Sequence, residues 1–196
     1  MSKYRHTQIW FFGSEIYKKI KDIVSNQQKM NILEIGCFEG LSSAFFADNL
    51  LDHPESTLTC VDPFLNISDN DHAELLRSEN TKDSNVESRF DYNMTICNHT
   101  NKISVHKKTS DEFFETNQAF YDFIYIDGSH KPDIITRDME NSFRFLNSGG
   151  IMWIDDYLGG PPYDDTIQRT MDAVLKAHEG EYETIHLGYQ IAIRKK

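Results

Sequence analysis

The amino-acid sequence predicts an α/β fold, in which a mainly parallel sheet is covered by helices on both faces. Short, continuously apolar runs alternate along the chain with longer amphipathic segments, and such runs are typical of parallel strands buried on both faces. One of them, residues 32–36, leads through a turn with Gly36 and Gly40 into a helix. The last two strand-like runs are separated by Gly188 alone, so they must pair antiparallel.

The remaining elements follow in chain order. Apolar residues spaced by three and four predict a first helix within residues 8–28. Apolar runs predict strands at residues 32–36, 57–62, 103–107, 123–127, 150–155, 182–187 and 189–194. Amphipathic spacing predicts further helices at residues 41–51, 134–146 and 167–177.

Residues 66–100 interrupt this alternation. They are polar and show little periodicity apart from a short helical pattern at residues 90–96. We expect them to be an insertion after the second strand that covers the ligand site. With a helical cap at residues 1–30, residues 1–196 are expected to form a single domain.

Composition limits the class of protein. Of 196 residues, 39% are apolar, enough for one core that buries roughly 70% of the unfolded chain's surface. The net charge is −11, and basic residues cluster only at the last three positions, so we expect no nucleic-acid partner. No apolar run reaches membrane-spanning length, and we expect no membrane partner.

The three cysteines, Cys37, Cys60 and Cys97, predict reduced thiols. Their number is odd, none forms a Cys-x-x-Cys pair, and no charged-then-apolar leader precedes them. This pattern indicates neither a disulfide framework nor a zinc site, and it favours a cytoplasmic location.

Several polar residues are expected at the carboxyl ends of the strands, where open α/β sheets bind ligands. Gly36 and Gly40 allow a ligand to approach the backbone and the N-terminal N–H groups of the next helix. Asp62 ends the second strand, where an acidic side chain can accept both hydroxyls of a ribose. Ser110 follows the third strand, and Glu34 lies within the first, where a buried carboxylate needs a partner.

Structural explanations stay open for these residues. Gly36 and Gly40 also suit a tight strand-to-helix turn, Glu34 can pair with a helix end, and Asp62 can form a turn before Pro63. The loop lacks the third glycine of a G-x-G-x-x-G dinucleotide motif. A nicotinamide-dependent dehydrogenase also needs a residue for hydride transfer, which the sequence does not offer.

The segment Glu34-Ile-Gly36-Cys-Phe-Glu-Gly40, Asp62 and the closing antiparallel pair resemble the class I S-adenosylmethionine-dependent methyltransferases. The resemblance runs from about residue 31 to the C-terminus. It implies a Rossmann-like, seven-stranded sheet of order 3-2-1-4-5-7-6 with S-adenosylmethionine as the cofactor. It also implies that Gly36 and Gly40 line the methionine part, that Ser110 lies near the adenine, and that Glu34 supports the loop.

A second polar group follows the fourth and fifth strands, which are neighbours in that order. Asp127, Asp155 and Asp156 would converge there, and like charges so close repel by several kcal/mol unless a cation lies among them. Oxygen ligands favour Mg²⁺, with Mn²⁺ as the alternative, and such an ion lowers the pKa of an acceptor hydroxyl. His130, three residues after Asp127, can take the proton as general base. The alternative is that these are turn, cap and loop residues.

The Asp-Gly-Ser-His and Asp-Asp patterns are similar to those of O-methyltransferases that modify sugar hydroxyls of macrolide antibiotics. This resemblance implies Mg²⁺ bound by Asp127, Asp155 and Asp156, with His130 as the base and a sugar or glycan as the acceptor. Catechol-type methyltransferases usually show Asp-Asn where this sequence has Asp155-Asp156, so they are the alternative.

Two further expectations concern partners. A non-catalytic module that keeps the cofactor fold would be expected to lose the carboxylate cluster, which this chain retains. The aromatic-rich N-terminus is a candidate homodimer interface.

Overall fold

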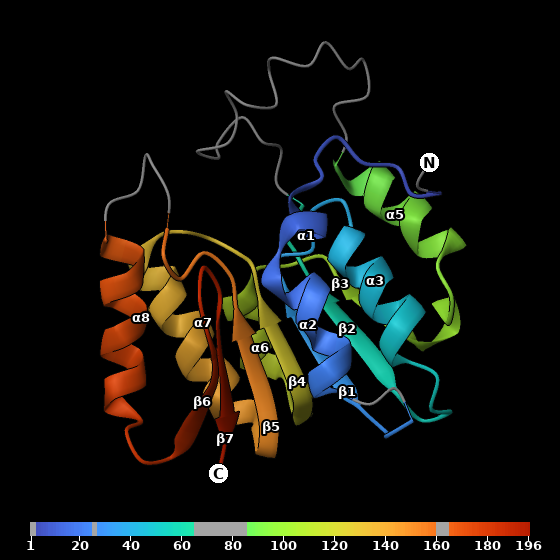
Figure 1. Cartoon of the computed structure of the whole chain (residues 1–196). Helices are drawn as coiled ribbons and strands as arrows, with labels where there is room; N and C mark the ends of the chain where they lie inside the picture. Colours follow the sequence, from blue (N-terminus) through green and yellow to red (C-terminus); the bar gives the residue numbers. More distant parts are fainter. Residues whose placement is uncertain (1–2, 25–26, 65–85, 160–164) are drawn as a thin grey trace.

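The computed structural model describes residues 3–24, 27–64, 86–159 and 165–196. Its centre is a seven-stranded sheet of order β3-β2-β1-β4-β5-β7-β6 (Figure 1). The strands are β1 (Asn31–Ile35), β2 (Thr57–Val61), β3 (Ile103–His106), β4 (Tyr121–Ile126), β5 (Leu146–Ile154), β6 (Tyr182–Leu187) and β7 (Ile191–Lys195). Neighbours from β3 to β5 pair parallel, whereas β7 pairs antiparallel with both β5 and β6. The predicted α/β class and strand order are confirmed.

Helices cover both faces of the sheet and bury two hydrophobic cores (Figure 1). The first core includes residues of α2 (Glu15–Ile23), α3 (Leu41–Leu50) and α5 (Val86–Ile96). The second includes residues of α6 (Ser110–Thr116), α7 (Pro132–Phe145) and α8 (Thr166–Ala177). Along β4, Phe123 and Tyr125 belong to the first core, and Ile124 and Ile126 to the second. Because alternate residues face different cores, the strands read as continuous apolar runs.

The N-terminal segment forms two helices rather than the single helix predicted at residues 8–28. α1 (Trp10–Gly13) is followed by Ser14, whose extended backbone (φ −65°, ψ 159°) interrupts the helix. The Ser14 hydroxyl accepts a hydrogen bond from the first turn of α2 and caps that helix. The predicted apolar face is real, since Ile16 and Ile20 are fully buried.

The sequence prediction lacks one helix, α6. The Thr109 hydroxyl accepts from the N–H of Glu112 (3.3 Å), and the Glu112 carboxylate accepts from the N–H of Thr109 (2.9 Å). This reciprocal capping box has a readable Thr-x-x-Glu signature. As a result, Ser110, which follows the third strand as predicted, is the first residue of a helix.

The predicted insertion at residues 66–100 is described only in part. α5 begins at Val86, earlier than the predicted helix at 90–96, and a 3₁₀ turn, η2 (Thr100–Lys102), leads into β3. Residues 66–85 lie outside the described residues, so the prediction for them stays a prediction. Among the described helices, none has the length and apolar composition needed to cross a membrane.

Candidate active site

The ends of β1 and β4 approach so closely that Gly36 has no room for a side chain. A Cβ on Gly36 would lie 2.0 Å from the backbone oxygen of Asp127, and the residue has φ +84°. Its N–H donates to the carbonyl of Val61 at the end of β2 (2.9 Å). The glycine loop, residues 36–40, therefore lies beside Asp127, one of the predicted metal ligands, at the carboxyl edge of the sheet.

Gly40 is the N-cap of α3 and makes room for α5. It has φ +78°, and a Cβ there would lie 2.8 Å from the ring of Phe90. Close packing thus requires both Gly36 and Gly40, which supports the structural explanation that the sequence left open. Their contact with a cofactor stays a prediction.

Glu34 lies in β1, just before the glycine loop. Its carboxylate is fully buried and accepts hydrogen bonds from the hydroxyls of Ser42 and Ser43 in the first turn of α3. Burial raises the pKa of Glu34 to about 7, with the serine bonds opposing the shift and the charge of Asp62 adding to it. This position fits the predicted role of supporting the loop.

Asp62 holds the loop through its backbone. One carboxylate oxygen accepts from the N–H groups of Cys37 (2.8 Å) and Phe38 (2.9 Å), and the other accepts from the N–H of Phe64 (2.7 Å). Burial raises the pKa of Asp62, and these three bonds oppose the rise. The oxygen that bonds to Phe64 keeps a second lone pair, and its contact with a ribose hydroxyl stays a prediction.

Ser110 interacts with a buried acid on the next helix. Burial raises the pKa of Asp138 in α7 to about 6, and the nearby Ser110 side chain opposes this rise. The predicted contact of Ser110 with an adenine remains untested.

Asp127 and Asp155 lie on either side of one tyrosine hydroxyl. The fully buried Tyr125 places its hydroxyl 3.0 Å from Oδ2 of Asp127 and 2.6 Å from Oδ2 of Asp155. Burial raises the pKa of Asp127, and the charges of Asp155 and Asp156 raise it further. Burial and the charge of Asp156 likewise raise the pKa of Asp155. The predicted convergence of these acids at the ends of β4 and β5 is therefore present.

Asp156 is tied to the predicted base. Its Oδ2 lies 2.6 Å from Nε2 of His130, and its Oδ1 accepts from the hydroxyl of Tyr189. Its own N–H donates to Asp155 (2.8 Å), with the residue in a left-handed conformation at φ +55°. The structure thus brings His130 to the acidic cluster, as predicted, through Asp156 rather than Asp127.

Tyr125 and Tyr189 are absent from the predicted site. Tyr125 precedes Asp127 by two positions in an apolar strand, and a hydroxyl there signals a buried polar partner. Tyr189 lies in the connection between β6 and β7, and the residues around it in the sequence do not indicate a role in the site.

A small cavity lies among the acidic side chains of Asp127, Asp155 and Asp156. It has a volume of about 10 Å³, roughly one water-sized sphere, and its lining includes Asp127, His130, Asp155 and Asp156. Hard carboxylate oxygens are the ligands that Mg²⁺ and Mn²⁺ prefer. Among the described residues, only Glu34, Cys37 and Cys60 place three ligand atoms within 4.8 Å of one another, and Glu34 already bonds to two serines. Asp127, Asp155 and Asp156 do not place three ligand atoms within that distance, so it is the oxygen chemistry of these aspartates, and not their spacing, that suits a divalent cation.

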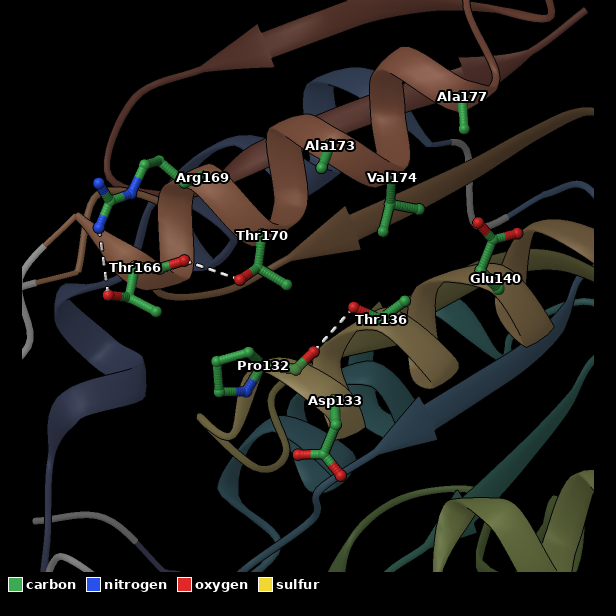
Figure 2. A pocket seen from close by; sticks show the side chains of 10 residues that line it. All are labelled: Pro132, Asp133, Thr136, Glu140, Thr166, Arg169, Thr170, Ala173, Val174 and Ala177. Atoms are coloured by element: carbon green, nitrogen blue, oxygen red, sulfur yellow. Dashed lines mark hydrogen bonds between the residues drawn. The ribbon is translucent and has the colours of Figure 1, made fainter.

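A larger groove of about 600 Å³ lies between α7 and α8. Figure 2 shows Thr136 of α7 and Thr170 and Val174 of α8 facing the gap between the two helices, whereas Asp133 points away from α8. None of the predicted site residues lines it, although Pro132 at one end follows His130 by two positions. The groove is therefore separate from the acidic cluster.

Comparison with known proteins gives the family. The family model Methyltransf_24, described as a methyltransferase domain, matches residues 33–157, more than half of the chain. The chain belongs to this methyltransferase family. The resemblance to class I S-adenosylmethionine-dependent methyltransferases is confirmed, and a comparison with curated sequences finds no match.

Solved structures share the fold of this methyltransferase. The O-methyltransferase TomG from Streptomyces achromogenes, in complex with SAM, is 18% identical with a TM-score of 0.63, covering 93% of this chain and 81% of that one. An O-methyltransferase from Bacillus cereus in complex with SAH is 18% identical with a TM-score of 0.56, covering 93% and 82%. SAH-bound PaMTH1 from Podospora anserina is 13% identical with a TM-score of 0.60, covering 85% and 71%.

Replacing Glu34 by Gln is expected to flatten the pH dependence of the methyltransferase's stability. Because burial raises the pKa of Glu34 from 4.5 to about 7, the folded protein keeps a proton that the unfolded chain has lost. The free energy of unfolding therefore falls as pH rises from about 5 to about 7, by up to about 3 kcal/mol, and Glu34→Gln removes this fall. Urea unfolding between pH 5 and pH 7 measures the free energy of unfolding. Equal curves for Glu34→Gln and the exposed control Glu115→Gln would contradict the prediction.

Removing the hydroxyl of Tyr125 is expected to destabilise the protein more at high pH than at low pH. Tyr125→Phe leaves Asp127 and Asp155 without their shared donor, at about 1–3 kcal/mol. At lower pH a protonated carboxyl can donate in its place, so the loss shrinks. The matched control is Tyr121→Phe on the same strand, whose hydroxyl bonds to Asn117 (3.0 Å). A pH-independent loss for Tyr125→Phe would disprove the sharing.

Proposed function

We propose that this methyltransferase transfers a methyl group from S-adenosylmethionine to a hydroxyl of a small molecule, with a sugar or glycan as the preferred acceptor. The observation that carries the proposal is the acidic cluster of Asp127, Asp155 and Asp156 with His130, next to the glycine loop. Methyl transfer to oxygen requires a deprotonated hydroxyl aligned with the sulfonium methyl, and such a cluster can both activate and orient it.

His130 is the proposed base, and Asp156 defines which atom accepts the proton. An ionised carboxylate only accepts hydrogen bonds, so Nε2 of His130 carries the hydrogen that faces Asp156. The ring lone pair then lies on Nδ1, which takes the proton from the acceptor hydroxyl. Asp156 stabilises the imidazolium that forms, and Tyr189 holds Asp156 in place.

Asp127, Asp155 and Asp156 are the residues that would hold a divalent cation, Mg²⁺ or Mn²⁺. When bound, such an ion would lower the pKa of an acceptor hydroxyl. The two lone pairs on each carboxylate oxygen leave room for a ligand beside the bonds from Tyr125, His130 and Tyr189.

The glycine loop is the proposed site of the cofactor. Asp62 bonds to its backbone, and Glu34 bonds to the first turn of α3 that follows it, so little conformational freedom is lost when a ligand binds. Gly36 and Gly40 would line the methionine part and Ser110 would lie near the adenine. The close approach of Gly36 to Asp127 would bring the methyl group near the acids.

A catechol-type acceptor is the second candidate. Two vicinal hydroxyls on an aromatic ring offer the same pair of oxygens as a sugar diol. The exposed aromatic side chain of Tyr189 bonds directly to Asp156 and favours a planar acceptor. An acceptor screen would distinguish a sugar acceptor from a catechol acceptor.

The proposed function predicts a strong, specific effect of His130. His130→Asn should lower kcat about 10²-fold or more and leave the KM for S-adenosylmethionine nearly unchanged. Methyl transfer to sugars and catechols with vicinal hydroxyls is the assay. His178→Asn is the matched control, since His178 also bonds to an acid, Glu140 (2.9 Å), on the outer helices.

Chelation tests the metal in the same assay. EDTA should abolish turnover, and Mg²⁺ or Mn²⁺ should restore it in the wild-type protein but not in Asp155→Asn. Full activity after chelation, or after removal of His130, would refute the corresponding part of the mechanism.

A further inference from the structure

Glu39 stands in the glycine loop and binds two distant parts of the chain. Its side chain is buried, with 1% exposure, although it lies between Gly36 and Gly40. The carboxylate accepts from Nε of Arg89 (2.5 Å), from the N–H of Thr7 (2.6 Å) and from the hydroxyl of Thr7 (2.7 Å). Arg89 belongs to α5, and Thr7 to the N-terminal segment.

The N-terminal strap, residues 3–7, is itself bound to α5. Figure 1 shows this segment running beside α5 before the chain enters α1. The buried Asn93 side chain accepts from the N–H of Arg5 (2.8 Å) and donates to its carbonyl (2.7 Å). The same amide group donates to the backbone carbonyl of Glu39 (2.8 Å). The strap, α5 and the glycine loop thus meet at one residue.

Stability alone is a poor explanation for this ion pair. Removing two charges from water offsets much of their attraction, and apolar residues often replace a buried pair without loss of stability. A buried pair with directed bonds does specify geometry. Here the geometry is that of the loop that forms the proposed cofactor site, and Trp10 of α1 stacks on Phe38 of that loop (6.1 Å between ring centroids).

We propose that Glu39 is a positioning residue for cofactor binding, and that it makes the N-terminal strap a working part of the cofactor site. The inference rests on the proposed function. Three donors from Thr7 and Arg89 fix the carboxylate, and the carboxylate fixes the loop between its two glycines. Loss of the bonds leaves the fold in place but loosens the backbone that meets the cofactor.

The test is calorimetric titration of the full chain with S-adenosylhomocysteine and S-adenosylmethionine. Glu39→Gln should bind both about tenfold more weakly, and Thr7→Val, which loses one of the bonds, about threefold more weakly. Tyr4→Phe is the control, because it cuts the bond between the strap and Asp48 of α3 without touching the loop. It should bind both ligands as the wild type does.

A charge-free pair separates positioning from stability. Glu39→Gln combined with Arg89→Met removes both buried charges and should recover the wild-type melting temperature, while cofactor binding stays weak. Faster amide hydrogen exchange in residues 36–41 should accompany the weak binding. Recovery of both properties, or wild-type affinity in Glu39→Gln, would overturn the inference.

The outcomes also distinguish this inference from the proposed function. A wild-type protein that binds neither ligand refutes the proposed function. A wild-type protein that binds, with variants that bind equally well, refutes only the role of Glu39. If Glu39→Gln does not fold, Thr7→Val decides, because it leaves the ion pair with Arg89 intact.

Discussion

Two carboxylates that share one hydroxyl proton are the constraint on which the rest of this structure depends. Tyr125 is fully buried and bonds to both Asp127 and Asp155, yet a phenol donates only one hydrogen. The site is therefore short of positive charge, as the raised pKa values of both acids indicate. Either a proton or a cation must supply it. Under the proposed function, a cation there would also lower the pKa of the acceptor hydroxyl.

Acidic residues also organise the neighbouring glycine loop through hydrogen bonds from several kinds of donor. Asp62 accepts from backbone N–H groups, Glu34 from serine hydroxyls and Glu39 from an arginine and a threonine. Gly36 then joins the loop to the acidic cluster, because its missing side chain allows contact with the backbone of Asp127. The net charge of −11 thus includes buried acids with defined structural tasks.

The fold was predictable because burial on both faces of the sheet gives the strands continuous apolar sequences. The acidic cluster was predictable because the carboxyl ends of parallel strands lie at one edge of the sheet. The break between α1 and α2 at Ser14 was not predictable, because the apolar spacing continues across the residue that caps α2. Hydrogen bonds between residues far apart in the sequence were not predictable either. His130 meets Asp156 only because β4 and β5 are neighbours, and Glu39 meets Arg89, 50 positions away, with no periodic signal to announce it.

Binding of Mn²⁺, followed by electron paramagnetic resonance on the protein saturated with S-adenosylhomocysteine, tests the central claim most directly. The account predicts one saturable ion per chain, lost in Asp127→Asn but kept in Asp122→Asn, which changes an acid at the opposite end of β4 that bonds to Asn31 and Asn147. No saturable binding, or equal binding by both variants, would contradict the claim that the shared acids form a cation site.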